Sequence, residues 1–309
     1  MLPAAIVKDE TGFRPIRATK VSPESPIVVL DSGLGGLTVV RALRAVLPHE
    51  DILYFGDTAR LPYGSKSAST VTTFVRQIIG YLRPHKPKHV VIACNTATAL
   101  ALPHIRGEFA DLSISGVIEP GAKAAVEAAG AKERPCIGVI ATEATVRSKA
   151  YERAIHRRRH YARLLLRSTP LLVPIIEEGR DARDPLVKLA LKQYLQPLAE
   201  RGIDVLLLGC THYPMLKGLI ARMVGNRVRV IDSAETCAED VHRRLRSAGL
   251  LRPAGRSQSS GSLRCFVTDD SPRFSALASH FLGFSIDTPT WVPPEALYGV
   301  MTIQMRRAV

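Results

Sequence analysis

Short apolar runs alternate with longer amphipathic stretches along most of this chain, and this alternation restricts the folds available to it. The runs are rich in valine and isoleucine, which is typical of buried strands. Strand signals that alternate with helix signals indicate an α/β fold with mainly parallel sheets. The predicted strands are IVVLD (27–31), DILYF (51–55), HVVIA (89–93), ISGVI (114–118), CIGVIA (136–141), LLVPII (171–176), DVLLLG (204–209) and RVRVID (227–232). The predicted helices of the first half are GLTVVRALRAV (36–46), KSASTVTTFVRQIIGYLR (66–83) and TALALPHIRGEF (98–109).

The chain has 309 residues, which exceeds the usual length of a single domain, so we expect two domains. HVVIACNTATAL and DVLLLGCTHYPML each run from an apolar strand into a cysteine and then into a helix. Ligands of open parallel sheets bind beyond the C-terminal ends of the strands. We therefore predict two similar three-layer α/β domains with the active site in the cleft between them. The expected divisions are an N-terminal extension (1–26), a first domain (27–118, completed by 228–309) and a second domain (119–227).

The composition is that of a globular chain. Hydrophobic residues make up 46% and charged residues 23% of the sequence. No apolar run approaches the roughly 18 residues that a bilayer-spanning helix needs, and the N-terminal stretch lacks the apolar core of a signal peptide. Five cysteines without a dense framework of spacings indicate free thiols in a reducing compartment. We therefore expect a cytoplasmic protein with no membrane partner.

The formal net charge of +14 has two interpretations. It could indicate binding to nucleic acid or another anionic surface, or it could reflect a solvated surface with a basic bias. No zinc-finger spacing or RNP-like aromatic motif accompanies the basic residues, so nucleic acid is not expected as the primary partner. Much of the excess charge lies in one segment that contains Arg147, Arg157, Arg158, Arg159, Arg163 and Arg167.

Cys94, in ACNTAT, follows a predicted strand and precedes a predicted helix. Unpaired N–H groups at a helix N-terminus stabilise a thiolate, so we expect them to lower the pKa of this thiol. Asn95 and Thr96 have short polar side chains that could bind a carboxylate or cap the helix. Considered alone, the motif fits a buried structural cysteine better, since free cysteines are commonly buried.

Cys210, in LLLGCTHYP, occupies the equivalent position in the second half, with Thr211 and His212 after it. A thiol beside an imidazole suits general acid–base chemistry, because histidine can adjust the ionisation of the thiol near neutral pH. Zinc is the alternative ligand for a Cys-x-His pair. A zinc site needs three or four ligands, however, and no matching second pair occurs in the sequence.

The glycine-rich segment DSGLGGLT (31–38) directly follows the first predicted strand. Its glycines permit a tight turn and the close approach of backbone to a ligand. Phosphate binding is a rival interpretation, but the spacing matches neither the dinucleotide fingerprint nor the P-loop. We expect Ser32 to contact the substrate. Asp31 could orient or ionise a thiol, pair with a substrate ammonium group, or merely cap the next helix.

Two further segments follow predicted strands. In YFGDTARLPYGSKS (54–67), Tyr63 and Gly64 could offer a hydroxyl and a backbone N–H to a carboxylate, although a turn built by Pro62 and Gly64 explains the spacing equally well. In ATEATVRSKAY (141–151), Thr142 is a natural helix cap that could also face the cleft.

Taken together, these motifs resemble the glutamate racemase family of the aspartate/glutamate racemase superfamily. Aspartate and hydantoin racemases share the two-cysteine plan, but the DSGxGG and LPYG segments resemble the glutamate branch. The extension 1–26, the arginine-rich stretch and the tail beyond about residue 250 carry no such motif. The matching segments, between about residues 27 and 236, are DSGLGGLTV, YFGDTARLPYGSKS, VIACNTATA, IGVIATEATVRSKAY, LLLGCTHYP and VIDSAE.

The resemblance implies a homodimer that interconverts L- and D-glutamate without pyridoxal phosphate or metal and so supplies D-glutamate for peptidoglycan. It also implies that Cys94 and Cys210 are the two acid–base residues, on opposite faces of the substrate Cα. The residues alone do not assign a cysteine to each enantiomer; by the resemblance, the first-half cysteine faces D-glutamate. The implied substrate contacts are Asp31, Ser32, Tyr63, Gly64, Asn95, Thr96, Thr142, Thr211 and His212.

Overall fold

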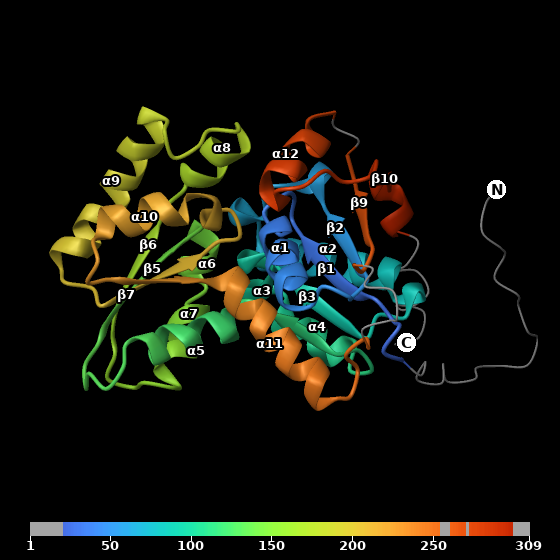
Figure 1. Ribbon diagram of the computed structural model, residues 1–309, viewed down its shortest axis with the longest axis horizontal. Helices are drawn as coiled ribbons and strands as arrows, with labels where there is room; N and C mark the ends of the chain where they lie inside the picture. The colour runs from blue at the N-terminus through green and yellow to red at the C-terminus, as the bar shows by residue number, and fades with distance from the viewer. Residues whose placement is uncertain (1–20, 254–259, 270–271, 299–309) are drawn as a thin grey trace, which may run out of the picture.

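The structure, a computed structural model, describes residues 21–253, 260–269 and 272–298. It has two lobes, each built around a parallel sheet, with helix α11 between them (Figure 1). Most of the predicted N-terminal extension lies outside the described residues. Within the described part of the chain, no helix is both long enough and apolar enough to span a bilayer.

The first sheet has six strands in the order β10-β9-β2-β1-β3-β4, and all of its pairings are parallel. Alternate residues of β1 point to opposite faces. Ile27 and Val29 pack with the helices of one face, and Val28 and Leu30 pack with those of the other. The sheet is therefore the middle layer of three. Its strands are β1 (Ile27–Asp31), β2 (Ile52–Gly56), β3 (His89–Ile92), β4 (Ile114–Gly116), β9 (Leu263–Val267) and β10 (Thr290–Trp291).

The second sheet has four parallel strands in the order β6-β5-β7-β8. It too is a middle layer, because Ile137 and Val139 of β5 pack into one apolar cluster and Ile140 packs into another. Its strands are β5 (Cys136–Ala141), β6 (Arg163–Ser168), β7 (Val205–Gly209) and β8 (Arg229–Asp232). The predicted α/β class, with mainly parallel sheets and two lobes, is confirmed.

The helices cover both faces of both sheets, and α11 packs against α1 and α5. After α11 the chain returns to the first sheet, where β9 pairs with β2. We propose a first domain of residues 27–118 completed by the chain after α11, which this return supports. The predicted boundary at 228 comes too early, because β8 (Arg229–Asp232) pairs with β7 in the second sheet, so the second domain extends from 119 to 232. The helices of the first lobe are α1 (Leu37–Val46), α2 (Ala68–Leu82), α3 (Asn95–Leu100), α4 (Leu102–Glu108) and α12 (Pro272–Leu282), with short 3-10 turns η1 (Thr58–Arg60), η2 (Tyr63–Ser65) and η3 (Arg83–His85).

The remaining helices are α5 (Ile118–Ala128), α6 (Glu143–Arg147), α7 (Ala150–His156), α8 (Leu172–Glu177), α9 (Pro185–Glu200), α10 (Lys217–Val224) and α11 (Ser233–Ser247), with the 3-10 turn η4 (Tyr213–Leu216).

Four elements differ from the sequence prediction: α8, β6, β9 and β10. The strands β9 and β10, both after residue 250, were not predicted. The run 171–176 was predicted as a strand but forms α8, since its buried residues Leu172, Ile175 and Ile176 have the spacing of a helix face. Pro174 lies in the first turn, where backbone N–H groups have no helical partner to lose. The prediction also missed β6, an edge strand with an arginine near each end and only partly buried side chains.

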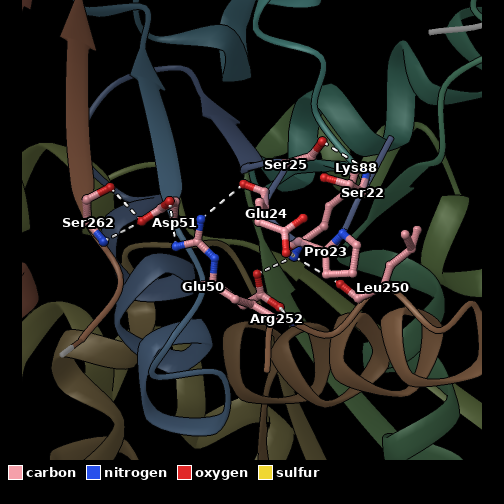
Figure 2. A network of polar contacts seen from close by, with 10 residues as sticks. All are labelled: Ser22, Pro23, Glu24, Ser25, Glu50, Asp51, Lys88, Leu250, Arg252 and Ser262. Carbon is pink, nitrogen blue, oxygen red and sulfur yellow. Dashed lines mark hydrogen bonds and ion pairs between the residues drawn. The ribbon is translucent and has the colours of Figure 1, made fainter. Parts of the chain in front are cut away.

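A buried ion pair connects the residues that precede β1 with the segment that follows α11 (Figure 2). Lys88, just before β3, pairs with Glu50, and both side chains are almost fully buried. The Lys88 ammonium also donates to the carbonyls of Pro23 and Leu250, and Glu50 accepts from the backbone N–H of Arg252 at 2.9 Å. Burial lowers the pKa of Lys88, although the hydrogen bond and negative charge of Glu50 act to raise it. Removing one partner would leave an uncompensated charge inside the protein.

We predict that Glu50→Gln lowers the free energy of unfolding by about 3 kcal/mol, because it leaves the Lys88 ammonium buried without its counter-charge. Denaturant titration measures this. Glu127→Gln, in the exposed Lys123–Glu127 pair, is the matched control and should change stability by less than about 0.5 kcal/mol. Equal effects of the two substitutions would contradict the prediction.

Candidate active site

A cavity of about 340 Å³ lies where strands of both sheets end. Its walls contain residues that lie one or two positions after the ends of β1, β3, β5 and β7. Both cysteines singled out from the sequence line it, together with all but one of the predicted substrate contacts. Those predicted residues are Ser32, Tyr63, Gly64, Cys94, Asn95, Thr96, Thr142, Cys210, Thr211 and His212. The residues that the sequence did not indicate are Leu61, Pro62, Ser65, Glu143, Thr169, Pro170, Val173, Pro174 and Glu177.

Cys94 is the N-cap of α3, and its sulfur accepts the backbone N–H of Ala97 at 3.5 Å. The sequence predicts a lowered pKa for this thiol, but burial and the neighbouring charge of Asp31 outweigh that hydrogen bond and raise the pKa to about 12. A helix N-terminus offers only partial charges, whereas burial removes the thiolate from water altogether. The Cys94 thiol therefore keeps its proton at neutral pH.

Cys210 lies at the end of β7 and contacts His212, with 3.8 Å between Sγ and Nδ1. On the other side of the ring, Nε2 is 2.9 Å from Oε1 of Glu177. Burial alone would lower the pKa of His212, but its hydrogen bonds to Cys210 and Glu177 outweigh burial and raise the pKa to about 10. The imidazole is therefore held as a cation beside the Cys210 sulfur.

Glu177 is the functional candidate that the sequence analysis missed. It is the last residue of α8 and directly follows the run 171–176 that was predicted as a strand. The Cys-x-His motif could have indicated it, because an imidazole that acts on a thiol commonly has a second polar group to orient it.

Asp31 is the predicted contact that does not line the cavity. It is the last residue of β1 and only 1% exposed, and its Oδ2 accepts the N–H of Gly33 at 3.0 Å. Burial raises its pKa, while the charge of His212 acts in the opposite direction. Helix α1 has no side-chain cap, so Asp31 does not serve as its N-cap. Asp31 lies behind the cavity wall and acts on Cys94 through its charge.

Gly35 of DSGLGG makes room for the opposite lobe and Gly36 makes room for Asp31, which corrects the expectation that a ligand approaches these glycines. A Cβ atom on Gly35 would lie 2.6 Å from Cε1 of His212, and one on Gly36 would lie 2.5 Å from Cβ of Asp31. Neither glycine lines the cavity. The N-terminal end of α1 therefore packs directly onto the Cys210 loop, where Thr38 Oγ1 donates to the carbonyl of Thr211 at 2.8 Å.

Threonines make further hydrogen bonds across the cleft. Thr96 Oγ1 lies 2.9 Å from Thr142 Oγ1, and Thr142 caps α6 as the sequence predicts. The hydroxyl of Tyr63 donates to the buried carboxylate of Asp57, so its proton is not available to a ligand. Within this segment, backbone N–H groups are then the better donors for a carboxylate.

The arginine-rich segment lies away from the cavity lining. Arg157 and Arg158 form ion pairs with Glu119, and Arg159 donates to the carbonyls of Gly130 and Lys132. These contacts within the protein already engage the three arginines on which nucleic-acid binding would have centred.

We predict that Glu177→Gln destabilises the fold most below about pH 6.5, the pKa of an unfolded histidine. The folded-state pKa of His212 is raised, so its proton stabilises the native state fully below that value and progressively less as pH rises toward 10. A neutral glutamine lowers this pKa, and the stability deficit should shrink between about pH 6.5 and 10. Denaturant unfolding across pH measures the deficit. Glu143→Gln, at the exposed rim, should show no such trend, and a pH-independent deficit for Glu177→Gln would contradict the assignment.

Comparison with known proteins shows the family. A family model described as Asp/Glu/Hydantoin racemase matches residues 37–241. Glutamate racemase of Neisseria meningitidis serogroup A is 44% identical over 267 residues, which cover 86% of this chain and 96% of that protein. The solved glutamate racemase of Thermus thermophilus is 42% identical with a TM-score of 0.78, over 89% of this chain and 100% of the other. That of Francisella tularensis, in complex with D-glutamate, is 34% identical with a TM-score of 0.79, over 87% and 98%. The chain belongs to the aspartate/glutamate/hydantoin racemase family, and its similarity is to the glutamate racemases within it.

Proposed function

We propose that this chain is a glutamate racemase that moves the Cα proton of glutamate between Cys94 and Cys210. The observation that carries the proposal is that one cavity is lined by both thiols, each at the end of a strand of a different sheet. A single base would have to cross the substrate plane, whereas two bases on opposite faces remain in place. Enclosure in a cavity strengthens the contacts that stabilise the carbanion-like transition state.

The two thiols have different starting states. Burial and Asp31 keep the proton on Cys94, while the Cys210 sulfur lies 3.8 Å from Nδ1 of the His212 cation. The resting protein is then prepared to remove a proton with Cys210 and to return one from Cys94. With the first-half cysteine facing D-glutamate, as the family resemblance implies, this is the form that accepts L-glutamate. In turnover of D-glutamate the roles are exchanged: Cys94 removes the Cα proton and Cys210 returns one.

The remaining polar lining suits an amino acid with two carboxylates. Backbone N–H groups, hydroxyls and an amide surround the cavity, and these are groups that hold carboxylates in place. We propose that Asp31 acts behind the wall through its charge, and that direct contacts come from Ser32, Tyr63, Gly64, Asn95, Thr96, Thr142, Thr211 and His212. No step of this proton transfer needs a cofactor.

We also propose a cytoplasmic homodimer that supplies D-glutamate for peptidoglycan. The glutamate racemases with which the chain aligns along almost their whole length support the role. The five free cysteines support a reducing compartment.

Racemisation in D₂O should place deuterium at Cα of the product without any added cofactor, because the proton on each thiol exchanges with solvent. Proton NMR of the product measures the incorporation. Product that retains its original hydrogen would contradict the mechanism. Turnover of aspartate, measured alongside, should be far slower; equal turnover would assign the chain to a sister activity instead.

Cys94→Ser and Cys210→Ser should each lower kcat by roughly 100-fold to 10,000-fold, because a hydroxyl is a far weaker acid–base group than a thiol. Polarimetric or coupled assays measure the loss in both directions. Cys237→Ser is the control, since Cys237 is buried in α11 outside the cavity lining, and it should keep kcat. A fully active variant at either position 94 or 210 would exclude a two-thiol mechanism.

A further inference from the structure

One hydrogen bond joins the lobes directly behind the cavity wall. Tyr151, in the first turn of α7, is 1% exposed, and its hydroxyl donates to Oδ1 of Asn95 at 2.6 Å. Asn95 is the first residue of α3, so the bond runs from a helix of the second sheet to one of the first. Burial raises the pKa of Tyr151 far above its usual value, which keeps the hydroxyl protonated and able to donate.

The other end of the Asn95 amide has no such partner. Asn95 is 2% exposed and lines the cavity next to Cys94. Its Nδ2 is buried, and no hydrogen-bond acceptor for it exists among the described residues. A buried N–H group without an acceptor is costly, so an acceptor on a bound ligand would stabilise it.

The acceptor side of the amide is therefore occupied by the protein, and the donor side is free. An amide that could rotate would present either an oxygen or an NH₂ group to the cavity, and the two attract opposite charges. Donation by Tyr151 requires the amide oxygen on its side. In the flipped orientation the Tyr151 oxygen would accept from Nδ2 instead, and its proton would lose the Asn95 acceptor.

We infer that Tyr151 is a positioning residue that holds the Asn95 amide with Nδ2 toward a carboxylate of the substrate. The inference rests on the proposed function, which supplies the carboxylate. Tyr151 and Asn95 belong to different lobes, so this orientation of the Asn95 amide exists only while the lobes are in contact. Substrate recognition therefore depends on the contact between α3 and α7.

Tyr151→Phe removes the hydroxyl and keeps the ring. We expect KM for glutamate to rise roughly tenfold, the scale of one hydrogen bond to a charged group, with a much smaller change in kcat. In an Asn95→Ala background the same substitution should have no further effect on KM, because the group that it orients is absent. Tyr194→Phe is the matched control: it removes the hydroxyl that accepts the N–H of Leu171, outside the cavity lining, and should leave KM unchanged.

An unchanged KM in Tyr151→Phe, or effects of positions 151 and 95 that simply multiply, would overturn the inference. A purely structural role would lower the melting temperature and leave the ratio of KM to kcat as it was.

Asn95→Asp tests the same orientation with Tyr151 intact, should Tyr151→Phe not fold. Aspartate still accepts from Tyr151 but replaces the NH₂ group by a second oxygen, so KM should rise more than in Asn95→Ala, at a mildly alkaline pH where the carboxyl is ionised. If Asn95→Asp binds glutamate as well as the unmodified protein does, the amide points the other way and the inference is wrong.

Calorimetric titration with glutamate separates this inference from the proposed function. A protein that binds glutamate without racemising it would contradict the function, and the loss of affinity in Tyr151→Phe and Asn95→Asp would still decide the role of Tyr151. A protein that does not bind glutamate would overturn both.

Discussion

Two parallel strands from different sheets, β3 and β7, end at the same cavity, and the rest of the site depends on this meeting. A strand end directs the next residue out of the sheet, and the helix that follows brings unpaired N–H groups to the same place. Cys94 and Cys210 need no long loops to reach one ligand. Gly35 keeps this arrangement compact, since any side chain there would collide with the Cys210 loop.

Burial controls the electrostatics of this site more strongly than local structure does. The N-terminus of α3 donates to Cys94, yet the pKa of this thiol is raised, because desolvation and Asp31 act in the same direction. His212 shows the reverse outcome: two acceptors overcome the burial that would otherwise neutralise it. The two thiols thereby have different surroundings: burial and Asp31 hold the proton on Cys94, and the His212 cation lies beside Cys210.

The sequence predicts most of the strands, and it places both cysteines at strand ends, because each depends on a short local pattern such as a buried apolar run that ends in a polar residue. It fails where position in the fold overrides that pattern. The apolar run at 171–176 is too short to distinguish strand from helix. The sequence therefore did not predict that Glu177, at the end of this helix, reaches the cavity. The strand β6 lies at an edge of its sheet and is only partly buried. It has an arginine near each end and therefore lacks the apolar pattern of a buried strand. The bond between Tyr151 and Asn95 joins residues 56 positions apart, which no local pattern encodes.

Charged groups outside the cavity lining hold both ends of helix α11, which lies between the lobes. Lys88 immediately precedes β3, and Cys94 follows two residues after the strand ends, so one strand joins the buried ion pair to the thiol. The Lys88 ammonium holds the carbonyl of Leu250, in the segment that follows α11 (Figure 2). Helix α11 begins at the end of β8 in the other sheet, where Asp232 caps it. The Lys88–Glu50 pair therefore fixes the chain at the C-terminal end of the helix between the lobes, while Asp232 fixes its N-terminal end.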